Sequence, residues 1–281
     1  MDYWLIALII SAVALLVLVG GFLFFFFFFA ILPGGRNREM ERYKFTRFAH
    51  RGIHADGAEE NSLSAFKKAM DAGFGIELDV RLCRDGELVV FHDDNLSRMC
   101  GIDGKVVDYT AEELAKIRLG NSDEGIPTLR QVLELVDGVV PLLIEIKKDL
   151  GEGKVAEKVL EVIGEYKGEY IVESFNPLAL RTVRRARPDI LLGILSCEYS
   201  KEEKYRGKLL YRLLEDMRLN FLFRPDFIAY EKCGHANRPL RFLRKTFGTP
   251  LYAWTVRSAE EERAAISDGF DSVIFEGYIP E

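Results

Sequence analysis

The sequence has few cysteines, no cysteine pair and no excess of basic residues. Its four cysteines, Cys83, Cys100, Cys197 and Cys233, are scattered and form no Cys-x-x-Cys motif. This spacing excludes a disulfide framework and a zinc signature, and free thiols fit a reducing cytoplasm. Acidic residues outnumber basic ones by 44 to 38, and the net charge of −6 argues against nucleic acid as a partner.

Charged residues are also missing from residues 3–32. A helix needs about 20 apolar residues to cross a bilayer core, so this run can span a membrane with tilt. Residues 33–35, Pro-Gly-Gly, end it. A cleaved secretory signal is the alternative, but the run is too long for one and no positive residue precedes it. We therefore expect residues 1–35 to be a transmembrane anchor.

The charges that flank this run predict its orientation. Only Asp2 and the amino terminus precede it, whereas five basic residues follow: Arg36, Arg38, Arg42, Lys44 and Arg47. Positive flanks stay cytoplasmic. We expect a single-pass membrane protein with residues 36–44 as a basic juxtamembrane linker and residues 45–281 as a cytoplasmic domain.

The 246 residues that follow residue 35 (281 − 35) suit one (β/α)8 barrel, which typically has about 250. Short apolar runs alternate with helical patterns, which indicates a parallel sheet. The predicted strands are residues 46–50, 75–81, 141–147, 170–174, 190–195, 226–230, 251–256 and 272–275. The predicted helices are residues 62–71, 128–136, 153–166, 177–187 and 258–267, and Thr110 and Glu113 form a capping box. We therefore predict a (β/α)8 TIM barrel after one transmembrane helix.

Two segments depart from this alternation. A tight turn at residues 84–87 predicts that residues 88–91 form a hairpin with the second strand. Residues 201–224 are rich in lysine, arginine, leucine and tyrosine, and we interpret them as an amphipathic outer helix that faces the membrane.

Two histidines lie at the predicted strand ends, where the chemistry of a TIM barrel is found. His50 and Arg51 end the first strand, and His92 follows the predicted hairpin. A histidine exchanges protons near neutral pH, and an arginine fork holds phosphate oxygens. One such group can activate a nucleophile while a second protonates a leaving group, so a pair of imidazoles suits acid–base catalysis.

Three carboxylates end neighbouring strands. Glu77 and Asp79 share one face of the second strand, and Glu145 ends the third with Lys147 two residues later. Carboxylates on one face repel unless a cation lies between them, and an all-oxygen site favours Mg²⁺ or Ca²⁺ over Zn²⁺. Lys147 either holds a bound phosphate or forms a salt bridge with a neighbouring acid. Trp254, in the seventh strand, is either core or a wall against the substrate.

Together these motifs resemble the glycerophosphodiester phosphodiesterase family, which is related to the phosphoinositide phospholipases C. The motifs in order are residues 49–52 (Ala-His-Arg-Gly), 60–62 (Glu-Asn-Ser), 75–80, 85–93, 125–129, 144–147, 174–175 and 254–256. Their joint order and spacing are specific, although no single motif is. Two positions depart from the family pattern: Glu59 replaces a proline, and Glu276 stands near the family's final acid.

The resemblance implies a role for each of these residues. His50 and His92 would be the acid/base pair, and Arg51 and Lys147 would hold the phosphate. The ligands of one divalent cation, Mg²⁺ or Ca²⁺, would be Glu77, Asp79 and Glu145. The expected reaction is hydrolysis of a glycerophosphodiester to a glycerol phosphate and an alcohol. The alternatives are a lysophospholipase D-like activity on lysolipids, a non-catalytic membrane module, and a phosphate-binding barrel of other chemistry such as an aldolase.

Overall fold

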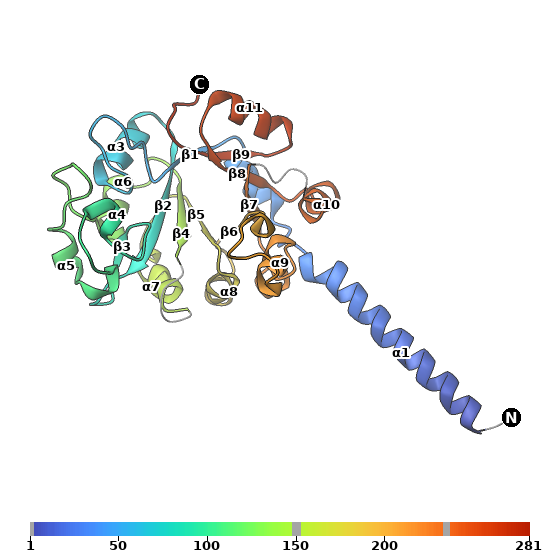
Figure 1. Ribbon diagram of the computed structural model, residues 1–281. Coiled ribbons are helices and arrows are strands. Elements are labelled where there is room, and N and C mark those ends of the chain that lie inside the picture. The colour runs from blue at the N-terminus through green and yellow to red at the C-terminus, as the bar shows by residue number, and fades with distance from the viewer. Residues whose placement is uncertain (1–2, 148–152, 233–236) are drawn as a thin grey trace.

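The computed structural model describes residues 3–147, 153–232 and 237–281, and Cys233 and His235 lie outside these ranges. Eight parallel strands form a closed barrel, as predicted (Figure 1). They are β1 (Arg47–His50), β2 (Gly75–Leu82), β4 (Leu142–Ile146), β5 (Tyr170–Ser174), β6 (Leu192–Ser196), β7 (Phe227–Glu231), β8 (Leu251–Val256) and β9 (Ser272–Phe275). β1 pairs with both β2 and β9, which closes the barrel.

The predicted hairpin is also present. β3 (Leu88–Val90) runs antiparallel to β2, and it positions the chain that follows it beside the barrel mouth. Between β3 and β4 lie the short helices α4 (Ser97–Cys100), η3 (Val106–Asp108) and α5 (Ala111–Leu114). Thr110 and Glu113 form the predicted capping box of α5.

Helices cover the outside of the barrel. They are α3 (Leu63–Asp71), α6 (Leu129–Val136), α7 (Lys154–Ile163), α8 (Pro177–Ala186), α10 (Arg238–Phe247) and α11 (Ala259–Ser267). The side chains of Ser62, Thr128 and Ser258 accept hydrogen bonds from backbone N–H groups in the first turn of the helices that follow them. These caps satisfy donors that have no partner within a helix.

Two helical segments differ from the prediction. Residues 201–224 are not one helix but η4 (Tyr199–Lys201), α9 (Leu209–Glu215) and η5 (Asn220–Leu222). Positive φ angles at Gly207 and Met217 interrupt the helical backbone on either side of α9. Helix α10 was not predicted, because its many basic residues conceal an apolar stripe of Leu240 and Leu243, both buried against the barrel.

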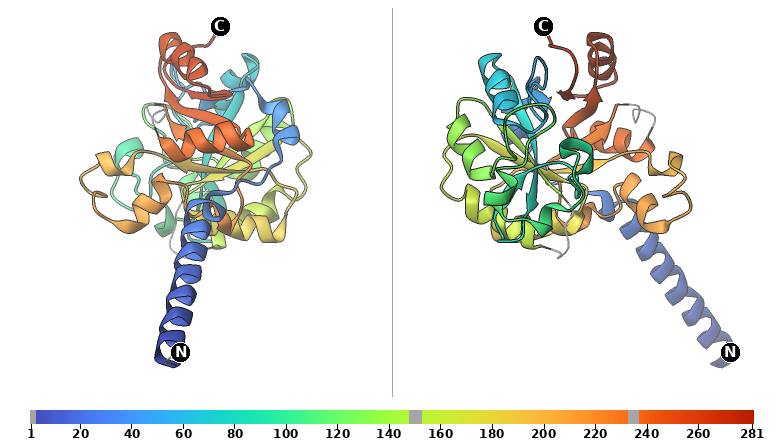
Figure 2. Two further views of the ribbon diagram at one scale, coloured as in Figure 1. Left: turned by 90° about the vertical axis from the view of Figure 1, so that its right-hand side faces the viewer. Right: turned by 60° about the vertical axis from the view of Figure 1, so that its left-hand side comes forward.

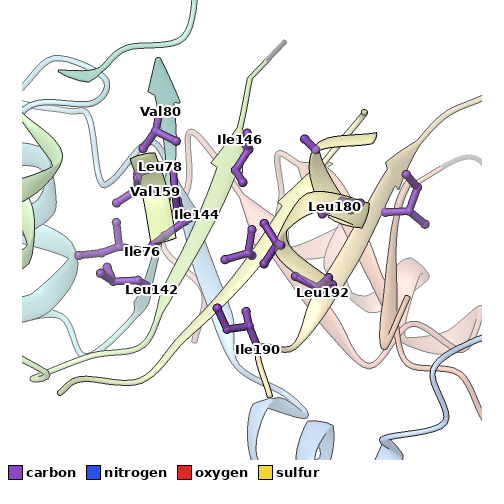
Figure 3. Close-up of a cluster of buried hydrophobic side chains, with 14 of the residues drawn as sticks. Ile76, Leu78, Val80, Leu142, Ile144, Ile146, Val159, Leu180, Ile190 and Leu192 are labelled. Atoms are coloured by element: carbon purple, nitrogen blue, oxygen red, sulfur yellow. The ribbon is translucent and has the colours of Figure 1, made fainter. Parts of the chain in front are cut away.

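The alternation of side chains along the strands separates two cores. Ile76, Leu78 and Val80 of β2 point outward, where they belong to one cluster with Val159 of α7 (Figure 3). The opposite faces of the strands fill the barrel interior with a second cluster, which includes Phe48, Leu143, Ile171, Phe227 and Tyr252. Since side chains alternate along a strand, the residues between the outward-facing ones, Glu77 and Asp79, point into the barrel.

The first helix, α1 (Tyr3–Phe27), projects away from the barrel (Figures 1 and 2) and is followed by η1 (Phe29–Ile31). Within the described residues it is the one helix long and apolar enough to cross a membrane. A membrane anchor and a signal sequence share these properties. Its carboxyl end contacts the barrel, because Phe25 packs on Phe221 and the Arg218 guanidinium lies 4.8 Å from the centre of the Phe26 ring.

Residues 36–44 close the barrel at the amino-terminal ends of its strands. They form α2 (Asn37–Met40) and η2 (Glu41–Tyr43), and Met40 and Tyr43 belong to the interior cluster. Arg36 and Arg184 both donate to the buried Asp226 carboxylate, which directly precedes β7. The segment next to the apolar helix is therefore packed into the barrel and ion-paired with it.

Candidate active site

Three carboxylates meet inside the barrel mouth. Glu77 and Asp79 come from β2, and Glu145 comes from β4, where it lies opposite Asp79 in the parallel register. One oxygen atom from each lies within 4.8 Å of the others, and all three residues are buried. Burial and the nearby charges of Asp79 and Glu145 raise the pKa of Glu77 well above its usual value. Burial opposes ionisation of Asp79 too, but Lys147 and Arg51 hold its pKa low.

These three residues fit a hard divalent cation. All their donors are oxygen atoms, as Mg²⁺ and Ca²⁺ prefer. Burial and the charges of Asp79 and Glu145 raise the pKa of Glu77, so added positive charge would favour its ionised form. Asp79 Oδ1 lies 2.7 Å from the Lys147 ammonium, yet no side chain in the described part of the chain gives it a well-aligned hydrogen bond. A buried carboxylate oxygen whose hydrogen bonding is incomplete in this way is a natural metal ligand.

Two cationic side chains flank the carboxylates. Lys147 Nζ lies 2.7 Å from Asp79 Oδ1 and 2.8 Å from Glu145 Oε2, so the salt bridge considered from the sequence is present. Arg51 donates to Glu60 at 2.8 Å, and its Nε lies 3.4 Å from Asp79 Oδ2. Both cations therefore lie directly beside the carboxylates.

The backbone after β1 takes a sharp turn that brings Arg51 to this position. Arg51 has a φ of 57°, and its N–H donates to Glu77 Oε2 at 2.9 Å. Gly52 follows with a φ of 81°, and a Cβ there would lie 2.8 Å from the Ala65 carbonyl carbon. The glycine is thus required for α3 to approach this turn.

Each of the two predicted histidines is held by a carboxylate through the same ring nitrogen. His50 Nδ1 lies 2.8 Å from Glu276 Oε2, and His92 Nδ1 lies 2.6 Å from Asp93 Oδ1. This arrangement leaves Nε2 of each ring on the side away from its carboxylate. Burial lowers the pKa of both histidines, against the effect of their acidic partners. The hydrogen bond from His50 lowers the pKa of Glu276 to about 2.

A set of polar residues that received no individual role from the sequence connects these groups. Asn61 is buried and donates to Asp79 Oδ2 at 2.8 Å. Arg98 bridges Glu60 and Asp93, with a 2.6 Å bond to Asp93. Glu60 and Asn61 belong to the Glu-Asn-Ser motif of residues 60–62, in the loop after β1, whereas no sequence pattern indicated Arg98. The chain Arg51–Glu60–Arg98–Asp93 joins the first loop to His92.

Glu173 is a further carboxylate that sequence reasoning missed. It lies on β5 opposite Glu145 and is buried, and its Oε2 has no hydrogen-bond partner among the described residues. Burial, with the charges of Glu77 and Glu145, raises its pKa well above the usual value. The sequence feature that could have indicated Glu173 is an acidic residue within an apolar strand, at the position that pairs with Glu145 on the neighbouring strand.

Trp254 and Phe175 form an aromatic pair at the carboxyl ends of β8 and β5. Trp254 is half-buried on β8, and its ring meets that of Phe175 edge to face at 5.5 Å. Both rings pack on the interior cluster of the barrel. Trp254 is thus part of the core, as one of the two readings had it, and it also borders a cavity.

Comparison with known proteins agrees with this geometry. The model of the glycerophosphoryl diester phosphodiesterase family matches residues 50–277. A glycerophosphodiester phosphodiesterase of Caldanaerobacter subterraneus is 35% identical over 239 residues, which cover 80% of this chain and 91% of that protein.

Solved structures show the same similarity. The glycerophosphodiester phosphodiesterase of Thermotoga maritima is 30% identical with a TM-score of 0.64, and the match covers 82% of this chain and 94% of that one. An Oleispira antarctica phosphodiesterase in complex with its product, sn-glycerol-3-phosphate, has a TM-score of 0.68 at 24% identity, over 84% and 94% of the two chains. This second similarity shows the fold.

Proposed function

The chain belongs to the glycerophosphoryl diester phosphodiesterase family, and from that premise we propose that it hydrolyses glycerophosphodiesters with the help of one divalent cation and two histidines. It is a phosphoric diester hydrolase. Water is consumed, the bond from phosphorus to the oxygen of one alcohol breaks, and the products are a glycerol phosphate and that alcohol. The observation that carries the proposal is the cluster of Glu77, Asp79 and Glu145 at the same barrel mouth as two carboxylate-held histidines.

In this proposal Glu77, Asp79 and Glu145 hold the cation, either Mg²⁺ or Ca²⁺. A bound cation of this kind offsets the negative charge that grows on the phosphoryl oxygens during the reaction. Arg51 contributes a planar fork of donors to those oxygens and Lys147 contributes a compact charge. Both are ion-paired with Asp79 in the structure, which holds them in place. Phosphate binding would replace part of these ion pairs with contacts to the phosphate oxygens.

His50 and His92 would carry the two proton transfers. One takes a proton from the attacking hydroxyl group, and the other gives a proton to the departing alkoxide. Glu276 and Asp93 orient the rings through Nδ1, so Nε2 is the nitrogen that would exchange protons with the substrate. Trp254 would pack against the glycerol or the head group.

We further propose that residues 1–35 anchor the enzyme in a membrane as a single pass and that residues 45–281 form a cytoplasmic catalytic domain. Residues 36–44 join the two parts and carry the positive charge that favours this orientation. In cells whose wall has been removed, an added protease should spare the barrel. Degradation of the barrel in intact cells would contradict the orientation.

A metal-by-substrate panel tests the reaction. Full-length protein stripped with EDTA should regain hydrolysis of glycerophosphocholine with Mg²⁺ or Ca²⁺. His50→Ala should lose about 10²–10⁴-fold in kcat, the usual contribution of a general acid or base. His54→Ala is the matched control, since His54 lies four residues away and borders a separate small cavity with Tyr278.

Retained activity in His50→Ala would overturn the two-histidine mechanism. A wild-type protein that cleaves no diester, with or without metal, would favour a non-catalytic membrane module instead.

A further inference from the structure

An apolar cavity of about 570 Å³ adjoins the candidate active site. It lies between the carboxyl ends of β5, β6 and β8 and the irregular segment 199–222, which contains α9. This volume is within the range of about 300–1,000 Å³ that is usual for small-molecule sites. Most of its lining is aromatic or leucine, including Tyr211, Leu214, Leu219 and Leu222.

One end of the cavity lies at the carboxyl ends of the barrel strands, the same end of the barrel as the carboxylates and the two histidines. Phe175 and Trp254 line it there, at the carboxyl ends of β5 and β8. Phe175 follows Glu173 by two residues, and Glu173 lies opposite the proposed metal ligand Glu145. A substrate whose phosphate meets the carboxylate cluster can therefore extend past these two rings into the cavity.

The other end of the cavity is attached to the apolar amino-terminal helix. Leu222 belongs to η5, whose residues contact the end of that helix and the segment that follows it. Phe221 packs on Phe25 with ring centres 5.4 Å apart. The Asn220 side chain donates to the Ile31 carbonyl, and Arg218 donates to the Phe26 carbonyl at 2.6 Å. The cavity wall and the proposed membrane anchor are thus continuous.

The outer side of this wall suits a lipid surface. Leu209 and Leu210 of α9 are 72% and 56% exposed, and the exposed basic residues Arg206 and Lys208 directly precede them. Exposed leucines next to basic side chains are typical of segments that lie at the level of lipid head groups. α9 also lies close to the barrel end of α1 in Figure 1.

We propose that this cavity binds the alkyl chain of a single-chain phospholipid, so that the substrate class of the enzyme includes lysophospholipids drawn from the membrane. The inference rests on the proposed function and deepens it. The reaction is unchanged: water supplies oxygen to phosphorus, the bond to the head-group oxygen breaks, and the head-group alcohol leaves with a proton. A lysophosphatidic acid remains.

The lining favours an alkyl chain over a cationic head group. A quaternary ammonium ion is bound by aromatic faces alone or with a carboxylate, and Tyr205, Tyr211 and Glu202 would suit one. The five leucines at positions 178, 210, 214, 219 and 222 offer nothing to a cation, but they match methylene groups. Each buried methylene contributes about 0.8 kcal/mol, or about fourfold in affinity.

The chain-length dependence of the full-length enzyme in nanodiscs tests the proposal. The substrates are glycerophosphocholine and a series of lysophosphatidylcholines whose chains are short enough to remain monomeric. We expect kcat/KM to rise with chain length, by up to about fourfold for each methylene that the cavity buries. The gain should appear mainly in KM, because contacts far from phosphorus stabilise substrate and transition state alike.

Two neighbouring substitutions supply a matched pair. Leu210→Trp places a bulky ring at the cavity and should flatten or invert the chain-length dependence. Leu209→Trp makes the same change on the same helix at a residue that does not line the cavity, and it should keep the wild-type dependence. The readout is the ratio of kcat/KM values for different substrates of one protein, so a reduced fraction of folded protein lowers both values equally and leaves the ratio unchanged.

Hydrolysis of glycerophosphocholine with no dependence on chain length would overturn this inference and leave the proposed function standing. A lost preference for choline over ethanolamine diesters in Leu210→Trp, without a chain-length effect, would also overturn it and assign the cavity to the head group. Failure to cleave any diester would instead reject the proposed function.

Discussion

Replacement of Glu276 is the sharpest test of how the site is organised. This carboxylate follows β9 and meets His50 Nδ1 at 2.8 Å, although the family pattern did not establish its role. The His50 and Glu276 side chains are 17% and 24% exposed, so solvent weakens the contact little. A hydrogen bond to a charged group contributes about 1.5–3 kcal/mol. If Glu276 orients His50 for catalysis, Glu276→Ala should lower kcat by about 30-fold, which corresponds to ~2 kcal/mol.

The pH profile separates orientation from loss of charge. Burial lowers the pKa of His50, and the hydrogen bond that His50 donates to Glu276 counteracts part of that effect. Glu276→Gln keeps an oxygen acceptor but removes the charge, so the pKa of His50 should fall further. The limb of the kcat/KM profile that reports His50 should therefore move to lower pH, whether this residue acts as acid or base.

The assay is metal-saturated hydrolysis of glycerophosphocholine across the pH range in which histidine titrates. Arg257→Gln is the control, because Arg257 also contacts Glu276, at 3.2 Å, but is 56% exposed and leaves the bond to His50 in place. If Glu276→Gln and Glu276→Ala both keep the wild-type kcat and profile, Glu276 does not position His50 and the argument fails.

Three further predictions concern the metal, the juxtamembrane segment and Glu173. The pKa of Glu77 is raised in the folded state, so this group stabilises the metal-free fold below the ordinary carboxylate pKa, and the stabilisation is lost as pH rises. Mg²⁺ or Ca²⁺ should therefore raise Tm more at alkaline than at acidic pH. Removal of residues 1–28 should leave a folded, active barrel. Removal of residues 1–44 also deletes the buried Tyr43 and should lower the free energy of unfolding in urea by several kcal/mol, as large core truncations do. Equal stability of the two truncated proteins would contradict this packing. Glu173→Gln should keep the Tm and metal dependence of the wild type, because burial already favours the uncharged form of this side chain; a large loss of either would show that the carboxylate is needed ionised.

The barrel was predictable because buried parallel strands are short apolar runs that recur between amphipathic helices. The observed bounds of β5, β8 and β9 equal the predicted ones. The segment around α9 was not predictable in this way. Its leucines and basic residues have helical composition, but positive φ angles at Gly207 and Met217 depend on how the segment packs between β6 and β7.

The candidate site was predictable where strand periodicity applies. Glu77, Asp79 and Glu145 converge as expected because their positions on adjacent strands are in register. The contacts of Glu276 and Arg98 were not predictable, since they join residues that are far apart in the sequence through loops. Loop conformation follows from packing and hydrogen bonding rather than from any period in the sequence.

The charge balance at the barrel mouth links the metal, the histidines and the pH dependence. The buried carboxylates number four, Glu77, Asp79, Glu145 and Glu173, whereas the cations in contact with them are Arg51 and Lys147. The Glu60–Arg98 pair is neutral by itself. Full ionisation would therefore leave two negative charges in a buried space (4 − 2 = 2), which is costly. Protonation can offset this charge, in line with the raised pKa values of Glu77, Glu145 and Glu173, and so can one divalent cation. In the proposed mechanism, Glu77, Asp79 and Glu145 would stay ionised around a bound cation, which would supply positive charge to a negatively charged transition state near His50 and His92.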